Sequence, residues 1–458
     1  MAGNDPETGP ETRPEPRAVL KRLYDAAVKD ALPEYCLPPY LPAPPEPERG
    51  RLVIFAIGKA AASMAAVAED WYDRHHPGTH IEGLALTRYG HARPTRHVEV
   101  LEAGHPIPDA AGEMASKRLL RLAEWVGPDD LALVLLSGGG SALSVQPMHG
   151  LTLEDEIFLT RALLSSGRPI GDINCVRKHI SRIKGGRLAE MLHPARSVTL
   201  AISDVAGDNP STIASGPTVP DTTAKVRVMA VLDSLKPPIP DELRARIAAL
   251  PETPKPNDEV FAHASYRLVA SGTGSLGAAA AIARAEGYEP VALGAAIEGE
   301  ARDLAETHAS LALAARAEGR RIAIISGGEA SVTFGEAAEG ATGKGGPNQE
   351  YALALAIALD GASDIFALAA DTDGIDGGTG AADDPAGAIV TPSTLARARE
   401  KGLHAGAFLD RHDSGTFFAE LGDLVTTGPS YTNVNDFRVI LVATAESPED
   451  PARKDKAE

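Results

Sequence analysis

The densest chemistry in the sequence lies in residues 174–218, where a basic helical pattern precedes a strand pattern that ends in an aspartate. Arg177, Ser181 and Lys184 recur at helical spacing, so two cations and a hydroxyl project from one face of the predicted helix. The apolar run SVTLAIS is typical of a buried strand, and Asp204 stands just past it. In open α/β sheets, ligands bind at the carboxyl ends of the strands. The combination favours a phosphorylated ligand with a divalent metal, and a surface helix salt-bridged to a loop is the alternative.

A lysine and a glycine-rich loop follow two other strand patterns. The strand RLVIFAIG ends at Lys59, ahead of an alanine-rich helix pattern whose N-terminus would attract anions. The strand LALVLLS precedes a triple-glycine loop whose N–H groups could surround an oxyanion. The loop residues are Ser137, Gly138, Gly139, Gly140 and Ser141. A solvated lysine and a plain tight turn are the alternatives, and the loop forms neither a P-loop nor a GxSxG elbow.

A second glycine-rich stretch, GATGKGGPNQE, stands ahead of the helix pattern YALALAIAL. Lys344 in this stretch is a candidate phosphate contact, because it lies just before a helix N-terminus. Asn348 and Glu350 could polarise a ligand or bind a metal, but they could equally cap the helix.

Candidate metal ligands follow the strand pattern IFALAA. Asp371 and Asp373 stand in the acidic, glycine-rich run DTDGIDGG, which indicates a hard cation, most simply Mg²⁺. The run does not continue into an EF-hand. His91 and His105 end two earlier strand-like segments, but two histidines without a third ligand more often make ordinary hydrogen bonds.

A GxGxxG motif, formed by Gly272, Gly274 and Gly277, lies between a strand pattern and a helix pattern. It has the form of a dinucleotide fingerprint, which also requires an acidic residue after the next strand. That strand, PVALG, is followed by Ala295 and Ala296 instead. We interpret the motif as a glycine-rich turn, with NAD binding as the minority interpretation.

Composition limits the class of protein. The chain has 458 residues, a formal net charge of −19 and 43% hydrophobic residues, so we expect a globular protein that binds neither nucleic acid nor anionic membranes. Cys36 and Cys175 cannot form a disulfide framework, and the sequence contains neither a signal-peptide pattern nor a membrane-spanning apolar run. We therefore expect a cytoplasmic protein.

The strand and helix patterns predict an α/β fold with two domains. Residues 18–258 should form a larger, Rossmann-like domain with a parallel sheet, and residues 259–445 a smaller α/β region at the carboxyl end. Residues 1–17 and 446–458 have the composition of disordered tails. We expect the active site to lie in the cleft between the domains.

Ten short motifs occur in one order along residues 18–445. They are GKA at Lys59, YGH, EAGHPIPD, LSGGGSAL, NxVRKHxSxIKGGRLA, SDVxGDxxxxIASGPT, SGGE, GKGGxNQE, DTDGIDG and TGPxxTNVND. The set resembles the bacterial and archaeal glycerate 2-kinases, whose carboxyl-terminal portion, here about residues 320–445, is called the MOFRL domain. Two positions depart from the family pattern: Pro347 replaces an arginine in the GGRNQE motif, and His412 replaces an asparagine before the DS pair.

The resemblance implies ATP-dependent phosphorylation of the 2-hydroxyl of D-glycerate, with Mg²⁺ or another divalent cation. The lysine and aspartate tied to activity in the family fall on Lys59 and Asp204, and Asp208 of the same SDVxGD motif joins the candidate binding residues. The expected partner is this small substrate, and a homo-oligomer is compatible with the sequence. Two alternatives stay open: an NAD(P)H-dependent hydroxypyruvate reductase, and a non-catalytic sensor of sugar acids.

Overall fold

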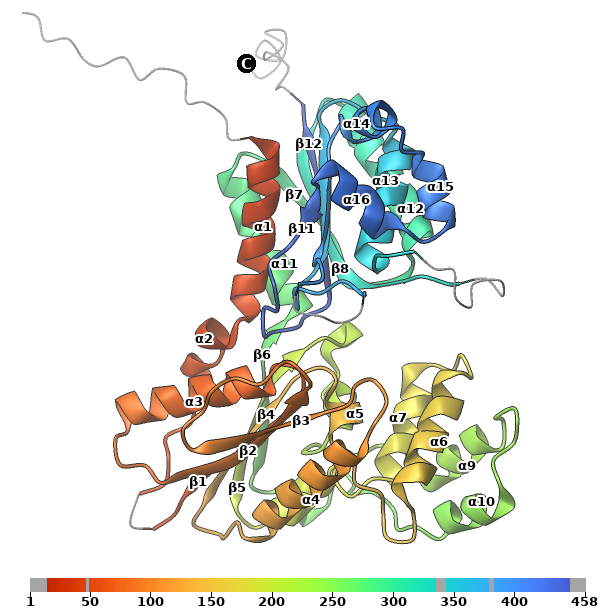
Figure 1. Cartoon of the computed structure of the whole chain (residues 1–458). Coiled ribbons are helices and arrows are strands. Elements are labelled where there is room, and N and C mark those ends of the chain that lie inside the picture. The colour runs from red at the N-terminus through yellow and green to blue at the C-terminus, as the bar shows by residue number, and fades with distance from the viewer. Residues whose placement is uncertain (1–14, 47–48, 335–342, 379–382, 445–458) are drawn as a thin grey trace, which may run out of the picture.

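The computed structural model describes residues 15–46, 49–334, 343–378 and 383–444. Within them the chain forms two α/β domains, drawn one above the other in Figure 1, and each is built on a six-stranded sheet. The predicted α/β class is confirmed. The tails 1–17 and 446–458 lie outside the described residues except for residues 15–17, of which Pro16 and Arg17 begin the first helix.

The first sheet is entirely parallel. Its strands, in spatial order, are β3 (Val98–Ala103), β2 (Ile81–Arg88), β1 (Leu52–Ile57), β4 (Leu131–Leu136), β5 (Arg196–Ser203) and β6 (Ala264–Ser271). This is the order of a doubly wound fold, and the direction of winding reverses between β1 and β4. The segments that follow β1 and β4 therefore diverge, and the crevice between them is where ligands of such sheets bind.

Helices cover both faces of the first sheet, which explains why β1 and β4 read as continuous apolar runs. Leu52 and Ile54 of β1 pack with α3 (Ala61–His75), whereas Val53 packs with α4 (Ala110–Glu124). Short helices and turns complete this domain. They are α2 (Pro33–Cys36), α5 (Gly140–Leu143), α8 (Arg187–Leu192), and the 3₁₀ turns η1 (Pro38–Tyr40), η2 (Ala206–Asp208), η3 (Ile213–Ser215) and η4 (Glu259–Phe261).

Four helices form a separate layer at one side of the first domain, seen at the lower right of Figure 1. They are α6 (Leu153–Leu164), α7 (Ile170–His179), α9 (Lys225–Leu232) and α10 (Asp241–Ala248). Leu159, Val176, Val228 and Leu243 belong to a core of their own. The layer positions α7, which carries Arg177.

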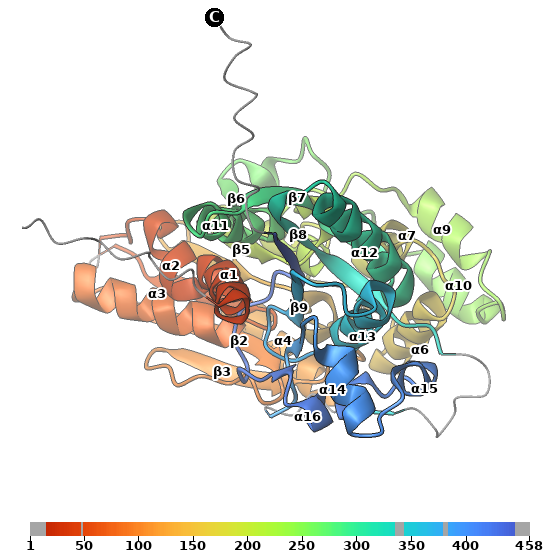
Figure 2. The same ribbon diagram turned by 90° about the horizontal axis from the view of Figure 1, so that it is seen from above.

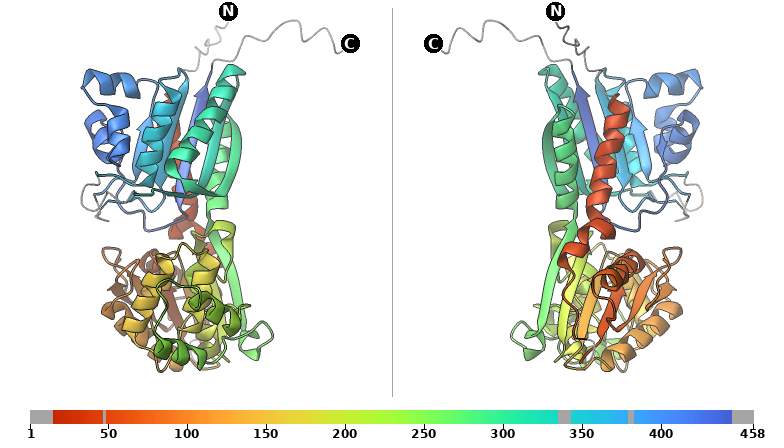
Figure 3. Two further views of the ribbon diagram at one scale, coloured as in Figure 1. Left: turned by 90° about the vertical axis from the view of Figure 1, so that its right-hand side faces the viewer. Right: turned by 90° about the vertical axis from the view of Figure 1, so that its left-hand side faces the viewer.

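The second sheet is mixed: β7 and β8 are parallel, and the other neighbours are antiparallel. Its strands, in spatial order, are β11 (Leu424–Val425), β10 (Gly387–Val390), β9 (Ile365–Asp371), β12 (Asp436–Ala443), β8 (Arg321–Ser331) and β7 (Glu289–Glu300). The helices of this domain are α1 (Pro16–Ala31), α11 (Gly272–Ala285), α12 (Ala301–Ala317), α13 (Pro347–Leu359), α14 (Thr394–Glu400), α15 (Ala405–Asp410) and α16 (Ser414–Leu421). Figures 2 and 3 show α1 and α11 on one face of the sheet and α12 and α13 on the other. Among the described helices, none has the length and apolarity needed to cross a membrane.

The chain passes between the domains twice. Helix α1 is the first element of the chain, yet Leu20 and Leu23 pack with Leu276 of α11 and with the second sheet. Strand β6 lies after residue 258, where the sequence suggested a boundary, yet it pairs with β5 of the first sheet. Two segments, α1 to β1 and β6 to α11, therefore connect the domains.

The GxGxxG motif does not build a dinucleotide-binding unit. Its strand β6 belongs to the first sheet, whereas the strand after its helix, β7, belongs to the second. A Rossmann fingerprint requires both strands to be neighbours in one parallel sheet. In addition, a Cβ at Gly274 would lie 2.9 Å from Oδ2 of Asp30, so this turn faces a carboxylate of α1.

Candidate active site

Lys59 and Asp204 come together at the carboxyl edge of the first sheet. Lys59 follows β1, Asp204 follows β5, and the triple-glycine loop after β4 lies against both. A Cβ at Gly138 would stand 1.7 Å from Oδ2 of Asp204, and a Cβ at Gly139 would stand 3.2 Å from Cγ of Lys59. Glycine is required at Gly138 because any side chain would displace the carboxylate.

The second domain closes over these two residues. Nζ of Lys59 lies 3.2 Å from Oδ2 of Asp373, which follows β9 of the second sheet. Nδ2 of Asn433 donates to Oδ2 of Asp204 across 3.2 Å, and Nδ2 of Asn435 donates to the Asp204 carbonyl oxygen. The candidate site therefore contains residues of both domains.

The two asparagines are functional candidates that the sequence analysis did not single out. They lie in the TNVND motif that leads into β12. Two amide side chains, two residues apart and just before a strand, were the feature of the sequence that could have marked them as candidates. Asn435 and Tyr431 both have positive φ, at 68° and 61°. Such backbone costs about 1–3 kcal/mol per residue and persists where the surroundings impose it, often at functional sites.

Buried carboxylates outnumber the one ammonium at the centre of the site. Burial opposes the charge of Lys59, but Asp373, Asp371 and Asp204 outweigh it and raise the lysine pKa. Burial raises the pKa of Asp204, partly offset by Lys59. Burial and the neighbouring Asp373 raise the pKa of Asp371 well above its usual range. The excess of negative charge would be relieved by a further cation.

The predicted Mg²⁺ ligands fit a cation that arrives with phosphate oxygens. Oδ1 of Asp371 accepts from the backbone N–H of Asp373, and Oδ1 of Asp373 accepts from Ile375 N, so both carboxylates are held in place. Over the described ranges, no group of three His, Cys, Asp or Glu side chains gathers as metal ligands. Mg²⁺ is commonly bound by one or two carboxylates together with substrate phosphates, and Asp371 and Asp373 satisfy that requirement.

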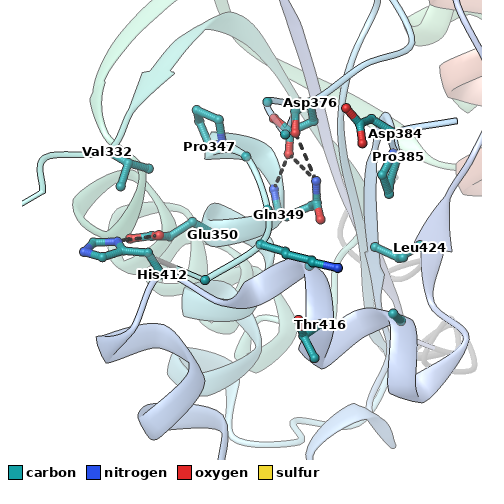
Figure 4. A pocket seen from close by; sticks show the side chains of 18 of the residues that line it. Val332, Pro347, Gln349, Glu350, Asp376, Asp384, Pro385, His412, Thr416 and Leu424 are labelled. Atoms are coloured by element: carbon teal, nitrogen blue, oxygen red, sulfur yellow. Dashed lines mark hydrogen bonds and ion pairs between the residues drawn. The ribbon is translucent and has the colours of Figure 1, made fainter. Parts of the chain in front are cut away.

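A cavity of about 850 Å³ opens beside this centre in the second domain. We call it the glycine-loop cavity, because residues 343–346 line it together with the first turn of α13, Asp376 and the apolar side chains of Val332, Phe334 and Leu424. Figure 4 shows Asp376 and Gln349 joined by hydrogen bonds in its wall. Asp376 stands three residues after Asp373, so the cavity adjoins the Lys59 centre.

The predicted residues around this cavity separate into two groups. Lys344 lines it, and within the described chain its ammonium has no ionic partner. Asn348 is buried, and its Nδ2 donates to Asp376 and Asp436, so it holds the helix in place and does not face the cavity.

Glu350 is paired within the cavity wall. Its Oε1 lies 2.7 Å from Nε of Arg302, and its Oε2 lies 2.9 Å from Nδ1 of His412 (Figure 4). His412 therefore contacts the carboxylate of Glu350, and Pro347 occupies the first position of α13. Neither departure from the family pattern disrupts the fold here.

The predicted cations on the basic segment also separate, and the single helical face predicted for them is wrong, because α7 ends at His179 and Ser181 and Lys184 follow it. Lys184 is fully buried and its Nζ lies 3.0 Å from Oε1 of Glu156, so it forms an internal ion pair and is not free to hold a ligand. Arg177 is half-buried, and no described residue forms a hydrogen bond or an ion pair with its guanidinium.

The remaining candidates support the loops around the site. Ser137 Oγ accepts from the N–H of Ala60 just before α3, and Ser141 Oγ lies 2.7 Å from Oγ of Ser215. Asp208 ends the turn η2 with a positive φ of 54°. Its side chain forms no hydrogen bond or ion pair with the described residues.

Comparison with known proteins shows the family to which the chain belongs. A family model described as a domain of unknown function, DUF4147, matches residues 19–248, and the MOFRL family model matches residues 322–436. The glycerate 2-kinase of Pyrococcus horikoshii is 38% identical over 86% of this chain and 88% of its own length. The chain belongs to the glycerate 2-kinase family.

Two further relatives of the family bear on function and fold. An Agrobacterium vitis protein, whose name proposes a hydroxypyruvate reductase, is 46% identical over 93% of this chain and 94% of its own length. The solved structure of glycerate kinase from Thermotoga maritima superposes with a TM-score of 0.81 at 34% identity, over 93% of this chain and all of that chain. The glycerate 2-kinase family thus includes proteins named for two different chemistries.

Proposed function

We propose that this protein transfers the terminal phosphoryl group of ATP to the 2-hydroxyl of D-glycerate, giving 2-phosphoglycerate and ADP. The observation that carries the proposal is the buried arrangement of Lys59, Asp204 and Asp373 around the triple-glycine loop, with groups from both domains. A reductase would need a dinucleotide site, and the GxGxxG turn does not provide one because β6 and β7 lie in different sheets.

The glycine-loop cavity is the proposed nucleotide site. Its volume of about 850 Å³ suits a nucleotide, and Val332, Phe334 and Leu424 offer apolar surface to a base. Lys344 would contact the phosphates. Because Asp376 lines this cavity and Asp373 reaches Lys59, a polyphosphate bound here would extend toward the ammonium.

Phosphoryl transfer depends mainly on charge neutralisation and alignment, because its transition state is loose. Lys59 would hold the oxygens of the transferred group, and Asp371 with Asp373 would hold Mg²⁺, which neutralises phosphate charge when bound. Asp204 would orient the 2-hydroxyl and accept its proton. Burial raises the pKa of Asp204, which makes the carboxylate a better proton acceptor than a solvated aspartate.

The test is ADP formation from ATP, Mg²⁺ and D-glycerate. Product identity is read with enolase, which consumes 2-phosphoglycerate and leaves 3-phosphoglycerate untouched. In parallel, NADH absorbance is followed with hydroxypyruvate. Oxidation of NADH with no ADP formed would replace the kinase proposal, and ligand-induced stabilisation without turnover in either assay would favour a sensor.

A further inference from the structure

Two arginines without partners lie at the carboxyl edge of the first sheet. Arg88 is the last residue of β2, and Arg177 is on α7. Both are half-buried, and among the described residues neither guanidinium has a hydrogen-bond or ion-pair partner. In a chain with a net charge of −19, unpaired and partly desolvated cations are costly, which points to an anionic ligand.

Both arginines belong to elements that contact the Lys59 centre. Thr87 Oγ1, one residue before Arg88, donates to the carbonyl oxygen of Lys59 across 3.2 Å. On the other element, Asn174 of α7 accepts a hydrogen bond from Ser215, whose hydroxyl contacts Ser141 after the glycine loop. The triple-glycine loop is thus flanked by the element that carries Arg88 and by the element that carries Arg177.

Two histidines complete this group. A Cβ at Gly139 would stand 3.0 Å from Nε2 of His105, and His105 follows β3 beside Arg88. His91 is only 3% exposed, and among the described residues neither of its ring nitrogens has a hydrogen-bond partner of good geometry, although the Lys59 backbone lies near it. Its ring lies 6.0 Å from the ring of Tyr431 in the second domain. A buried imidazole with both nitrogens unsatisfied is unfavourable unless a ligand or water meets it.

The charge state of these histidines follows from their surroundings. Burial, then Arg88 and Lys59, lower the pKa of His91 to about 4, against the opposing effect of Asp373. Burial, then Lys59, Arg88 and Arg177, lower the pKa of His105 to about 4. Both rings are therefore neutral near neutral pH, and each offers one N–H donor and one acceptor.

We infer that Arg88 and Arg177 bind the carboxylate of the phosphoryl acceptor, and that His91 forms a hydrogen bond with a polar group of the same acceptor. Guanidinium groups form bidentate ion pairs with carboxylates, which a neutral polyol cannot form. The subsite would select hydroxycarboxylates and would place the hydroxyl group toward Lys59 and Asp204. This inference rests on the proposed kinase function and names which residues recognise its acceptor.

The proposed acceptor site and the proposed nucleotide site belong to different domains. The glycine-loop cavity belongs to the second domain, whereas Arg88 and Arg177 belong to the first. If the arginines served ATP phosphates instead, their loss would weaken ATP binding. The acceptor assignment therefore predicts a rise in the KM for D-glycerate, and the nucleotide assignment predicts a rise in the KM for ATP.

The experiment compares Arg88→Gln, Arg177→Gln and the double variant with the full-length parent. Arg182→Gln is the matched control, because Arg182 is also a half-buried arginine without a side-chain partner among the described residues, but it lines a different cavity with Met148 and Arg187. We expect the KM for D-glycerate to rise about tenfold to a hundredfold in each single variant. The KM for ATP should stay within about twofold, and the control should match the parent.

Binding measurements test the inference without requiring catalytic turnover. Calorimetric titration with D-glycerate, and with malonate as a carboxylate that lacks the hydroxyl, should show affinity in the parent and the control but not in the double variant. Circular dichroism and the melting temperature verify that the variants fold. An unchanged glycerate affinity, or a rise confined to the KM for ATP, would overturn the inference. Absence of ADP formation in the parent, with malonate and glycerate binding still lost in the double variant, would refute only the kinase function.

Discussion

Asn433 of the second domain donates a hydrogen bond to the carboxylate of Asp204 in the first, across 3.2 Å. The bond holds one oxygen of Asp204, and in the proposed mechanism the other oxygen would accept the proton of the acceptor hydroxyl. Since Asn435 holds the carbonyl oxygen of the same aspartate, the alignment of Asp204 depends on closure of the domains. Under the proposed mechanism, Asn433 would link contact between the domains to the alignment of Asp204.

Replacement of Asn433 should therefore impair turnover more than binding. We expect Asn433→Ala to lower kcat about tenfold to a hundredfold, because Asp204 loses its alignment. Asn433→Asp should be worse than Asn433→Ala, because a second carboxylate would raise the pKa of Asp204 further and shift the pH–rate profile upward. Steady-state kinetics between pH 5.5 and pH 9 measure both effects. Equal kcat values and profiles in the parent and both variants would contradict this role.

Replacement of Lys59 should lower the turnover strongly and also reduce the stability of the protein around the site. Lys59→Met preserves much of the side-chain length but removes the charge that balances Asp204, Asp371 and Asp373. We expect kcat to fall about a thousandfold or more, as for other cations on a transferred phosphoryl group. Lys59→Arg is the control, since it retains the charge and should retain part of the activity. A melting temperature near that of the parent with normal turnover would remove Lys59 from the mechanism.

Much of the centre could be predicted because strand-end positions depend on local sequence. Lys59, the glycine loop and Asp204 each follow an apolar run, and the carboxyl ends of parallel strands meet at one edge of a sheet. Asn433 and Asn435 could not be found this way, because their partner is 229 to 231 residues away and belongs to another domain.

Helical spacing was a weaker guide to the site than strand ends. It predicts which residues share one face of a helix, but it shows neither where the helix ends nor which residues pack against that face. The spacing predicted one helical face for Arg177 and Lys184, yet α7 ends at His179, and Lys184 lies beyond it in a pair with Glu156 of α6 that no local pattern indicates. The GxGxxG pattern alone is ambiguous for a related reason. A strand–turn–helix pattern does not reveal that the next strand, β7, joins another sheet.

The low pKa of His91 predicts how the free energy of unfolding depends on pH. The unfolded side chain titrates near 6.5 and the folded one near 4, so between these values the unfolded state binds more protons. Stability from this group is therefore full above pH 6.5 and is lost as the pH falls toward 4. His91→Gln should reduce the pH dependence of the unfolding free energy by at most about 1.4 kcal/mol per pH unit in this range. Chemical denaturation at pH 4.5, 5.5 and 7.5 provides the measurement, and parallel curves for parent and variant would contradict the assignment.

Lys344 should affect ATP and not glycerate. Lys344 lines the glycine-loop cavity and has no ionic partner among the described residues, so Lys344→Gln should raise the KM for ATP about tenfold with little change in the KM for D-glycerate. Asn348→Leu is the contrasting variant. It removes donors from Asp376 and Asp436 and should lower the melting temperature. A nucleotide titration that shows equal affinity in the parent and Lys344→Gln would place the phosphates elsewhere.

The buried pair of Lys184 and Glu156 should matter for folding and not for ligand binding. Both side chains are almost fully buried, 3.0 Å apart, and burial lowers the pKa of Lys184 against the opposing effect of Glu156. Lys184→Met leaves an uncompensated carboxylate, so we expect a loss of about 3–5 kcal/mol in unfolding free energy. The double variant Lys184→Met/Glu156→Leu should recover most of that loss, because no isolated charge then remains buried. Denaturant unfolding measures the stability, and the KM values for ATP and D-glycerate in the double variant should match those of the parent. A large rise in either KM in a stable double variant would show that Lys184 contributes to ligand binding.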